Sequence, residues 1–246
     1  MPAKKSNKTA KKKVQPQNKT NQKVTKKQHT GVQAHGQMWE EQVVGVLVSP
    51  QNMDQMQALS YTAVHDIPKS VSKTGRNVSV KATKNKTVGF GDALRTITNL
   101  KKDSPLEAVV ISYDQLGPFK QPSKVTRLDL TNAKHILLGT SSSDDINDIV
   151  NEVRKLDSMV KKGDPAYKKA AVELRRKMAD SYLSVAPKIG NPSKKRAGRL
   201  QIVLRDVNRL ATEHPQLVIH DEHCHSIDGC LGKLAHSARS MQGKKS

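Results

Sequence analysis

The first 38 residues carry only positive charge, and this feature limits what the chain can fold into more than any other. Ten lysines and no acidic residue precede Glu40, and most of the other side chains are Gln, Asn, Thr and Ala. Such a segment cannot bury enough apolar surface to offset the conformational entropy lost on folding. We therefore predict a disordered basic arm over residues 1–38, with the folded body starting at Trp39. The lysines of the arm are Lys4, Lys5, Lys8, Lys11, Lys12, Lys13, Lys19, Lys23, Lys26 and Lys27.

The arm has two competing interpretations: a solubilising or nuclear-import tail, and an arm that contacts the phosphates of a nucleic acid. The body helps to decide between them, because it keeps 33 of the 43 Lys and Arg residues against all 22 acidic residues. Arm and body thus share a positive charge, as expected of a protein that covers a polyanion. We favour nucleic-acid binding by the arm.

Residues 39–140 are predicted to form a β-rich domain. Apolar and polar residues alternate over 77–83, which is typical of a half-buried strand. A polar turn after this strand predicts that 87–91 returns as its hairpin partner, and Asp92 is placed to cap a short helix. Residues 114–122 are expected to form a loop. The predicted strands are 41–49, 77–83, 87–91, 106–113, 125–130 and 134–138.

Residues 141–214 are predicted to form three amphipathic helices. In the first, apolar residues over 146–160 recur at spacings of three and four, between serine caps and a terminating Gly163. The second helix is expected within 164–187 and the third over 193–213. Strands followed by helices predict an α+β fold, in which the helices pack on one sheet face or act as an association module.

Basic side chains line the outer faces of the second and third predicted helices. Charged residues opposite an apolar stripe are the ordinary solvated face of a helix. Here, however, only three acidic residues occur between Lys168 and Arg209, so few i, i+4 ion pairs can balance the positive charge. We therefore add eight residues of the body to the predicted nucleic-acid interface. These are Lys168, Lys169, Arg175, Arg176, Lys194, Lys195, Arg196 and Arg199.

The chain lacks the features of modules that recognise base sequence. Aromatic residues make up only 3% of the chain and form no RNP-like cluster. No Cys₂His₂ spacing or leucine-zipper basic region occurs. Contact with phosphates remains, so we expect sequence-tolerant and salt-sensitive binding of nucleic acid, with RNA favoured. Such binding is cooperative when bound copies touch one another, and we expect self-association.

Residues 215–246 are predicted to form a C-terminal tail that contains histidine and cysteine. A structural zinc ion would need four ligands from this tail, and no Cys-x-x-Cys pair is present. We favour a polar, solvated tail and expect no cofactor. The two cysteines provide no disulfide framework, as in proteins kept in a reducing compartment. The candidate zinc ligands are His220, Cys224, Cys230 and His236.

No motif supports an enzyme. The glycine-rich sequence Gly89-Phe90-Gly91 lacks the lysine and hydroxyl residue of a phosphate-binding loop. No Gly-x-Ser-x-Gly, His-Glu-x-x-His or paired-carboxylate signature occurs. The longest apolar run covers 43–48, far short of the ~20 residues that a transmembrane helix needs. We predict a non-enzymatic protein with no small-molecule substrate and no membrane span.

The layout of a lysine-rich arm, a basic body and amphipathic helices is similar to that of viral nucleocapsid or coat proteins. This resemblance implies RNA packaging, in the virion and the host cytoplasm. A jelly-roll coat needs about eight strands, and only six or seven candidates precede the helices, so helical or irregular ribonucleoprotein packing fits better. The alternatives are a viral movement or matrix protein, or a cellular chromatin- or ribosome-associated protein in the nucleus or nucleolus.

Overall fold

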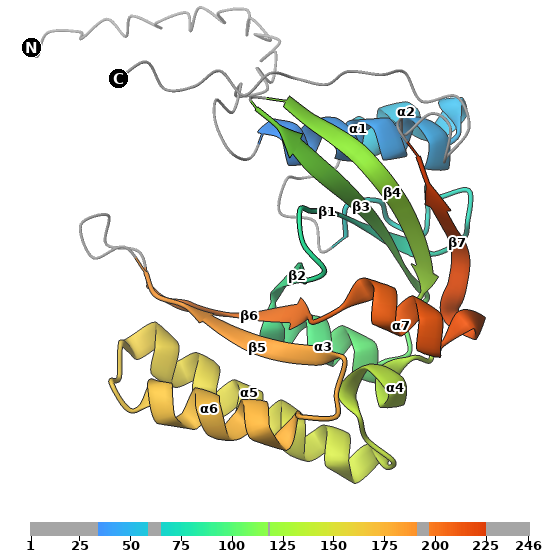
Figure 1. Cartoon of the computed structure of the whole chain (residues 1–246). Coiled ribbons are helices and arrows are strands. Elements are labelled where there is room, and N and C mark those ends of the chain that lie inside the picture. The colour runs from blue at the N-terminus through green and yellow to red at the C-terminus, as the bar shows by residue number, and fades with distance from the viewer. Residues whose placement is uncertain (1–33, 59–64, 118, 191–196, 225–246) are drawn as a thin grey trace, which may run out of the picture.

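The computed structural model describes residues 34–58, 65–117, 119–190 and 197–224, and it confirms the predicted α+β fold (Figure 1). One sheet has four strands, in the order β1 (Asn77–Thr83), β3 (Leu106–Leu116), β4 (Phe119–Asp129) and β7 (Val218–His223). The other has three, in the order β2 (Val88–Asp92), β6 (Arg199–Leu204) and β5 (Leu183–Lys188). The α-helices are α1 (Ala34–Leu47), α2 (Met53–Gln57), α3 (Ala93–Lys101), α4 (Lys134–Leu138), α5 (Ser143–Lys162), α6 (Tyr167–Lys177) and α7 (Val207–Glu213).

Strand β3 lies inside the four-stranded sheet and is buried on both faces. Ala108 and Val110 belong to the main core, whereas Val109 and Ile111 belong to a second core that helix α1 closes with Trp39. Strand β3 runs parallel to β1 and antiparallel to β4. A strand buried on both faces has a continuous apolar sequence, and this is why the sequence predicts it well.

The predicted strand over 41–49 is wrong, because most of these residues belong to helix α1. Trp39, Val43 and Leu47 are spaced four apart, and all three are buried in the second core. The run between them has the composition of a strand, but it buries only one helical face. Helix α1 also begins at Ala34, inside the segment that we expected to be disordered.

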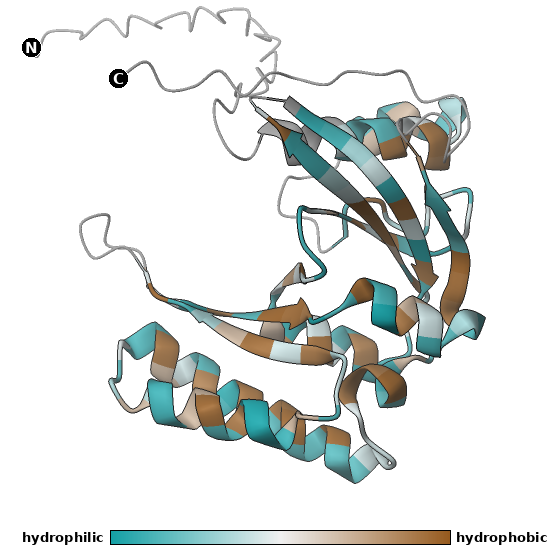
Figure 2. Ribbon diagram, viewed as in Figure 1, coloured by the Kyte–Doolittle hydropathy of each residue, from teal (hydrophilic) through white to brown (hydrophobic). Residues whose placement is uncertain are grey.

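Among the described residues, helices pack on only one face of the three-stranded sheet. Leu200, Ile202 and Leu204 of β6 lie in the main core, against which α3, α5 and α6 pack (Figure 1). Hydrophobic and hydrophilic bands alternate along α5 and α6, as expected of helices with one buried face (Figure 2).

Helix α5 is the first predicted amphipathic helix, and its limits are confirmed. Ser142 caps its start: the Ser142 hydroxyl accepts from the Asp145 N–H at 3.2 Å, and the Asp145 carboxylate accepts from the Ser142 N–H at 3.0 Å. The helix ends at Gly163, whose φ of +70° is left-handed. Its apolar stripe is buried within the chain, against α3, α6 and β6. The buried residues of this stripe are Ile146, Val150, Val153, Leu156 and Val160.

The second and third predicted helices are wrong in part. Helix α6 ends well before Pro187, and β5 occupies the last part of the predicted helix. Strand β6 lies in the middle of the third predicted helix, so that only α7 is helical there. Leu200 and Leu204 fit both a helical and a strand period, whereas Ile202 fits the strand alone. The sequence over 193–213 was therefore ambiguous, and the helical interpretation was incorrect.

The predicted hairpin between 77–83 and 87–91 is wrong. The Thr83 hydroxyl donates to the Thr87 carbonyl at 2.8 Å, so the chain turns where the sequence predicts a turn. However, β1 pairs with β3, whereas β2 leaves the turn and pairs antiparallel with β6. The turn thus connects the two sheets. The two cores lie on opposite faces of the four-stranded sheet.

The remaining elements divide between confirmed and corrected predictions. The strands predicted at 106–113 and 125–130 are confirmed, but they extend through the expected loop at 114–122 as one long hairpin. The cap is confirmed as well, since Asp92 accepts from the Arg95 N–H at 2.8 Å at the start of α3. The predicted strand over 134–138 is wrong, because these residues form the short helix α4.

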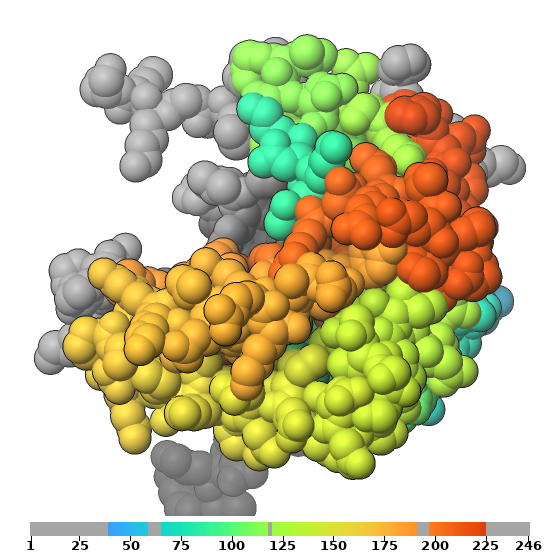
Figure 3. Space-filling model, turned by 60° about the horizontal axis from the view of Figure 1, so that its bottom comes forward, coloured from blue at the N-terminus to red at the C-terminus, as the bar shows by residue number. Residues whose placement is uncertain are grey.

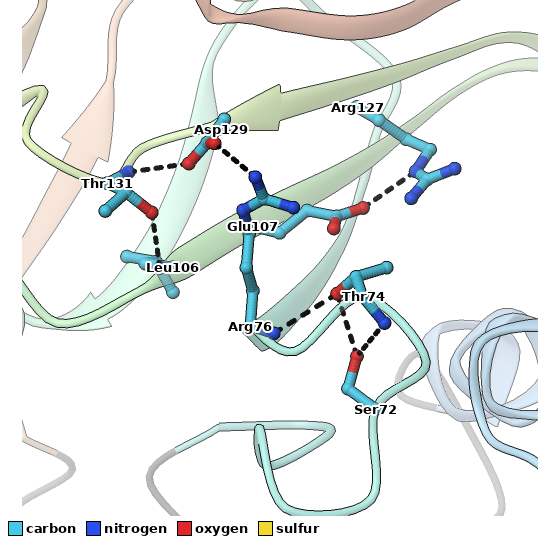
Figure 4. A network of polar contacts seen from close by, with 8 residues as sticks. All are labelled: Ser72, Thr74, Arg76, Leu106, Glu107, Arg127, Asp129 and Thr131. Carbon is cyan, nitrogen blue, oxygen red and sulfur yellow. Dashed lines mark hydrogen bonds and ion pairs between the residues drawn. The ribbon is translucent and has the colours of Figure 1, made fainter.

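A partly buried polar network ties together the ends of β1, β3 and β4 (Figure 4). The Arg76 guanidinium lies 2.8 Å from the Asp129 carboxylate, and the Arg127 Nε donates to the fully buried Glu107 at 2.7 Å. Burial alone would raise the pKa of Asp129, but hydrogen bonds from Thr131 and the charge of Arg76 lower it overall. These ion pairs offset the cost of burying charge at this end of the sheet.

Glu40 of helix α1 makes the stability of the fold depend on pH. Burial and the nearby Asp66 carboxylate raise its pKa from 4.5 to about 7, although Lys81 opposes the shift. Between these pH values the folded state holds a proton that the unfolded chain releases. Stability should therefore fall by roughly 2–3 kcal/mol as the pH rises from 4.5 to 7, and stay at the lower level above pH 7.

Replacing Glu40 with Gln should remove this loss of stability. We expect Glu40→Gln to melt at a higher temperature than the parent at pH 8 and at a similar temperature at pH 5, as followed by circular dichroism. Glu41→Gln is the matched control, because Glu41 is exposed and its charge is the smallest of the causes that raise the pKa of Glu40, so most of the pH dependence should remain. If the melting temperatures of Glu40→Gln and the parent changed with pH in the same way, Glu40 would not be the source of the pH dependence.

Candidate nucleic-acid interface

Only part of the predicted interface lies among the described residues. All ten lysines of the arm, and the three residues Lys194, Lys195 and Arg196, lie outside them. The remaining five are Lys168, Lys169, Arg175, Arg176 and Arg199, and all five are exposed.

Helix α6 presents its basic residues away from the core. It buries Ala171 and Leu174 against the main core, so Lys169 and Arg176 lie on the opposite side of the helix. Lys168 lies on its flank. None of these three cations forms an ion pair with the described residues. Figure 3 shows α5 and α6 at the surface of the helical side of the molecule.

Arg175 has a structural contact that the sequence does not reveal. Its Nε donates to the carbonyl of Val185 at 2.9 Å, at the free edge of strand β5. An unpaired strand edge is a site for unwanted pairing, and a charged side chain blocks it. Lys177, on the other flank of α6, pairs with Glu152 of α5 at 2.8 Å. Arg175 is therefore less free than its neighbours to bind a phosphate.

Lys188 is a functional candidate that the sequence reasoning missed. It ends strand β5 and lies directly opposite Arg199, which begins strand β6. Both side chains are exposed, and neither forms an ion pair with the described residues. Like charges in opposite positions destabilise a strand pair. A sequence signal existed, since the glycine, asparagine and proline over 190–192 are typical of a hairpin turn between two strands.

The base of this hairpin packs against the end of helix α5. A side chain at Gly198 would lie only 2.7 Å from the Val160 carbonyl, so the two backbones are in close contact. The end of α5 carries two lysines. Lys161 pairs with the buried Asp157 at 2.6 Å, which raises the pKa of Lys161, whereas Lys162 is exposed and has no ion pair in the described part of the chain.

Helix α6 and strand β5 bring the backbones of Lys168 and Lys188 to the same end of the molecule, with the Lys188 side chain on the opposite face of the sheet from α6. The two elements run antiparallel, and Arg175 contacts Val185 between them (Figure 1). Lys168 lies seven helical residues before Arg175, which is about 10 Å along the helix. Lys188 lies three strand residues after Val185, which is also about 10 Å along the strand. The ends of α5, α6 and the β5–β6 hairpin thus meet on one side of the molecule. We call their unpaired cations the basic end: Lys162, Lys168, Lys169, Lys188 and Arg199.

The helix dipole accounts for only part of this charge. Helix α5 begins with Asp144 and Asp145 and ends with Lys161 and Lys162, as expected of a helix that complements its own dipole. Lys168 and Lys169, however, lie in the first turns of α6, where the dipole disfavours cations. Lys188 and Arg199 lie on strands. Favourable interaction with helix dipoles therefore explains Lys161 and Lys162, but not the other cations of the basic end.

The structure gives no support to a zinc site in the tail. His220 lies in strand β7, which pairs with β4 and replaces the solvated loop that we predicted. Cys224 is disulfide-bonded, contrary to our expectation, and a sulfur in that state is not a thiolate ligand. Cys230 and His236 lie outside the described residues. Across 34–224, with the gaps given above, no group of three His, Cys, Asp or Glu side chains could hold a metal ion.

Comparison with known proteins gives no family assignment: no protein-family model, no curated protein and no solved structure matches the chain. Among the described helices, none is both long and apolar enough to span a bilayer.

Proposed function

We propose that the protein binds nucleic acid without recognising base sequence and packages it, most like a viral nucleocapsid or coat protein, with RNA favoured. The observation that carries this proposal is the basic end, and above all the pairing of Lys188 with Arg199 on neighbouring strands. Two cations held together at a cost in stability, without an acidic partner, suit an anionic ligand. The arm adds ten further lysines to the same polyanion.

The chemistry of the basic end favours phosphates over bases. A phosphate contact needs only an exposed cation, and such contacts position a nucleic acid without reading it. Stacking of bases would need exposed aromatic rings. Tyr167, the aromatic residue of α6, is instead partly buried against the main core. The binding we propose is therefore salt-sensitive and sequence-tolerant.

A triple variant tests the role of the basic end. The variant replaces three cations with Gln: Lys168, Lys188 and Arg199. For single-stranded RNA, it should lower the slope of log K against log salt by about 2, from ~0.7 per lost contact. Affinity should drop by the same factor on two unrelated sequences, as measured by fluorescence anisotropy.

The matched control removes three exposed lysines elsewhere in the fold: Lys69, Lys84 and Lys102. Their replacement by Gln should change the slope much less. Equal effects of the two triple variants would mean that net charge, and not the basic end, drives binding. Loss of affinity for one RNA sequence alone would show base readout and contradict the proposal.

Size-exclusion chromatography with and without nuclease separates packaging from simple binding. A nucleocapsid should elute as a large particle that collapses to small oligomers once its RNA is digested. A monomer under both conditions would favour the chromatin- or ribosome-associated alternative.

A further inference from the structure

The three-stranded sheet has one face that no described helix covers. Helices α3, α5 and α6 all lie on the other side of it (Figure 1). Of the side chains of β5 and β6 that point away from these helices, Ser184 is buried, whereas those of Ala186, Gln201 and Val203 are partly exposed and those of Lys188 and Arg199 are exposed. We call this surface the open face: Gly89, Ala186, Lys188, Arg199, Gln201 and Val203.

The open face is positively charged at its hairpin end and polar but uncharged in its middle. The cations Lys188 and Arg199 lie side by side at the hairpin end, and Gln201 follows in the middle. The Gln201 amide forms no hydrogen bond with the described residues. Asp92 is next to Gln201 in register on β2, but its carboxylate is used to cap α3. Apart from Asp92, the polar side chains of this face that solvent reaches are thus two cations and one amide, because Ser184 is buried.

The middle of the open face has little side-chain bulk, because β2 contributes a glycine there. Gly89 lies beside Gln201, and a side chain at Gly89 would come within 3.5 Å of the Gln201 amide nitrogen. Three strands measure about 10 Å across, and a strand of six residues is about 20 Å long. This area suits one extended strand lying lengthwise, with the hairpin end towards its phosphates.

We propose that the open face binds a single, unpaired RNA strand, an inference that rests on the proposed function. Phosphates lie between Lys188 and Arg199, which relieves the repulsion of the two cations. An exposed base meets the Gln201 amide, which can both donate and accept hydrogen bonds and so accommodates any base. In a duplex the Watson–Crick edges are used in base pairing and cannot make this second contact.

The test compares two double variants that remove the same charge from different surfaces. Lys188→Gln with Arg199→Gln alters the open face, whereas Lys69→Gln with Lys102→Gln removes two exposed lysines that lie outside the basic end. With a labelled 12-nucleotide oligouridine, we expect the first pair to weaken binding about tenfold and the second less than about threefold. Gln201→Glu, which places a carboxylate in the middle of the open face, should weaken it about fivefold or more. The parent should bind the oligouridine more tightly than an RNA duplex of equal length.

Each outcome bears on one of the two proposals. Equal losses from both double variants, or preference for the duplex, would overturn binding on the open face but leave nucleic-acid binding intact. No binding of either RNA by the full chain would overturn both. Lys188→Gln with Arg199→Gln should melt at or above the parent temperature, because it removes a repulsion, so this pair keeps the test valid even if Gln201→Glu unfolds the chain.

Discussion

Deleting residues 1–33 should lower the slope of log K against log salt for single-stranded RNA by up to about 7 units, from ~0.7 for each of ten lysine contacts. Seven slope units mean that, between 50 and 200 mM salt, the affinity of the parent falls about 10⁴-fold more than the affinity of the deletion variant. The deletion ends before Ala34, so that helix α1 keeps Trp39, Val43 and Leu47 in the second core.

The control for this deletion is a full-length chain in which all ten lysines are replaced by Gln. It should reproduce the lost slope, because the effect comes from charge and not from length. Circular dichroism should show that both chains melt like the parent. If the deletion leaves slope and affinity unchanged, the arm is a tail without a role in binding.

Replacing Ile149 and Leu156 with Asp should unfold the protein. Leu156 is 2% exposed and Ile149 packs on the same core, where α5 meets α3 and α6. A buried carboxylate without a partner costs several kcal/mol, and the lost packing adds to this. The sum is comparable with the whole stability of an ordinary domain. Circular dichroism should therefore show loss of the melting transition.

Light scattering on the same double variant distinguishes a core helix from an assembly helix. A folded variant of reduced mass would mean that α5 lies between copies of the chain, contrary to the intramolecular packing described above. Ser158→Asp is the control, since Ser158 is exposed on the same helix and its replacement should change neither melting nor mass. If α5 is a core helix, the self-association that we predict must use another surface.

Elements with one clear periodicity were predictable from the sequence. Helix α5 combines a long apolar stripe with a capping serine and a terminating Gly163, and no other structure fits all three. Strand β3 was predictable because burial on both faces gives an unbroken apolar run.

Short elements whose apolar spacing fits both a helix and a strand were not predictable. The spacing of Leu200 and Leu204 is shared by a helix and a strand, and only pairing with β5 and β2 decides for the strand. The same holds for α1, whose β-branched run is typical of a strand until the burial of Trp39, Val43 and Leu47 is known. Tertiary contacts override local preference in both cases.

The candidate site was predictable only where it depends on one helix. Exposure of Lys168, Lys169 and Arg176 follows from the apolar stripe of α6. Lys188 was missed because its position opposite Arg199 depends on a hairpin that the sequence reasoning did not assign. The contact of Arg175 with the edge of β5 also joins two elements, and no local pattern reports it.

The central claim is that this chain holds nucleic acid through its phosphates, and a salt titration of the full chain tests it most directly. Affinity for two unrelated single-stranded RNAs of equal length should be measured from 50 to 300 mM salt. The account predicts steep lines of equal slope and nearly equal affinity for the two RNAs. A flat salt dependence, or a strong preference for one of the two sequences, would contradict it.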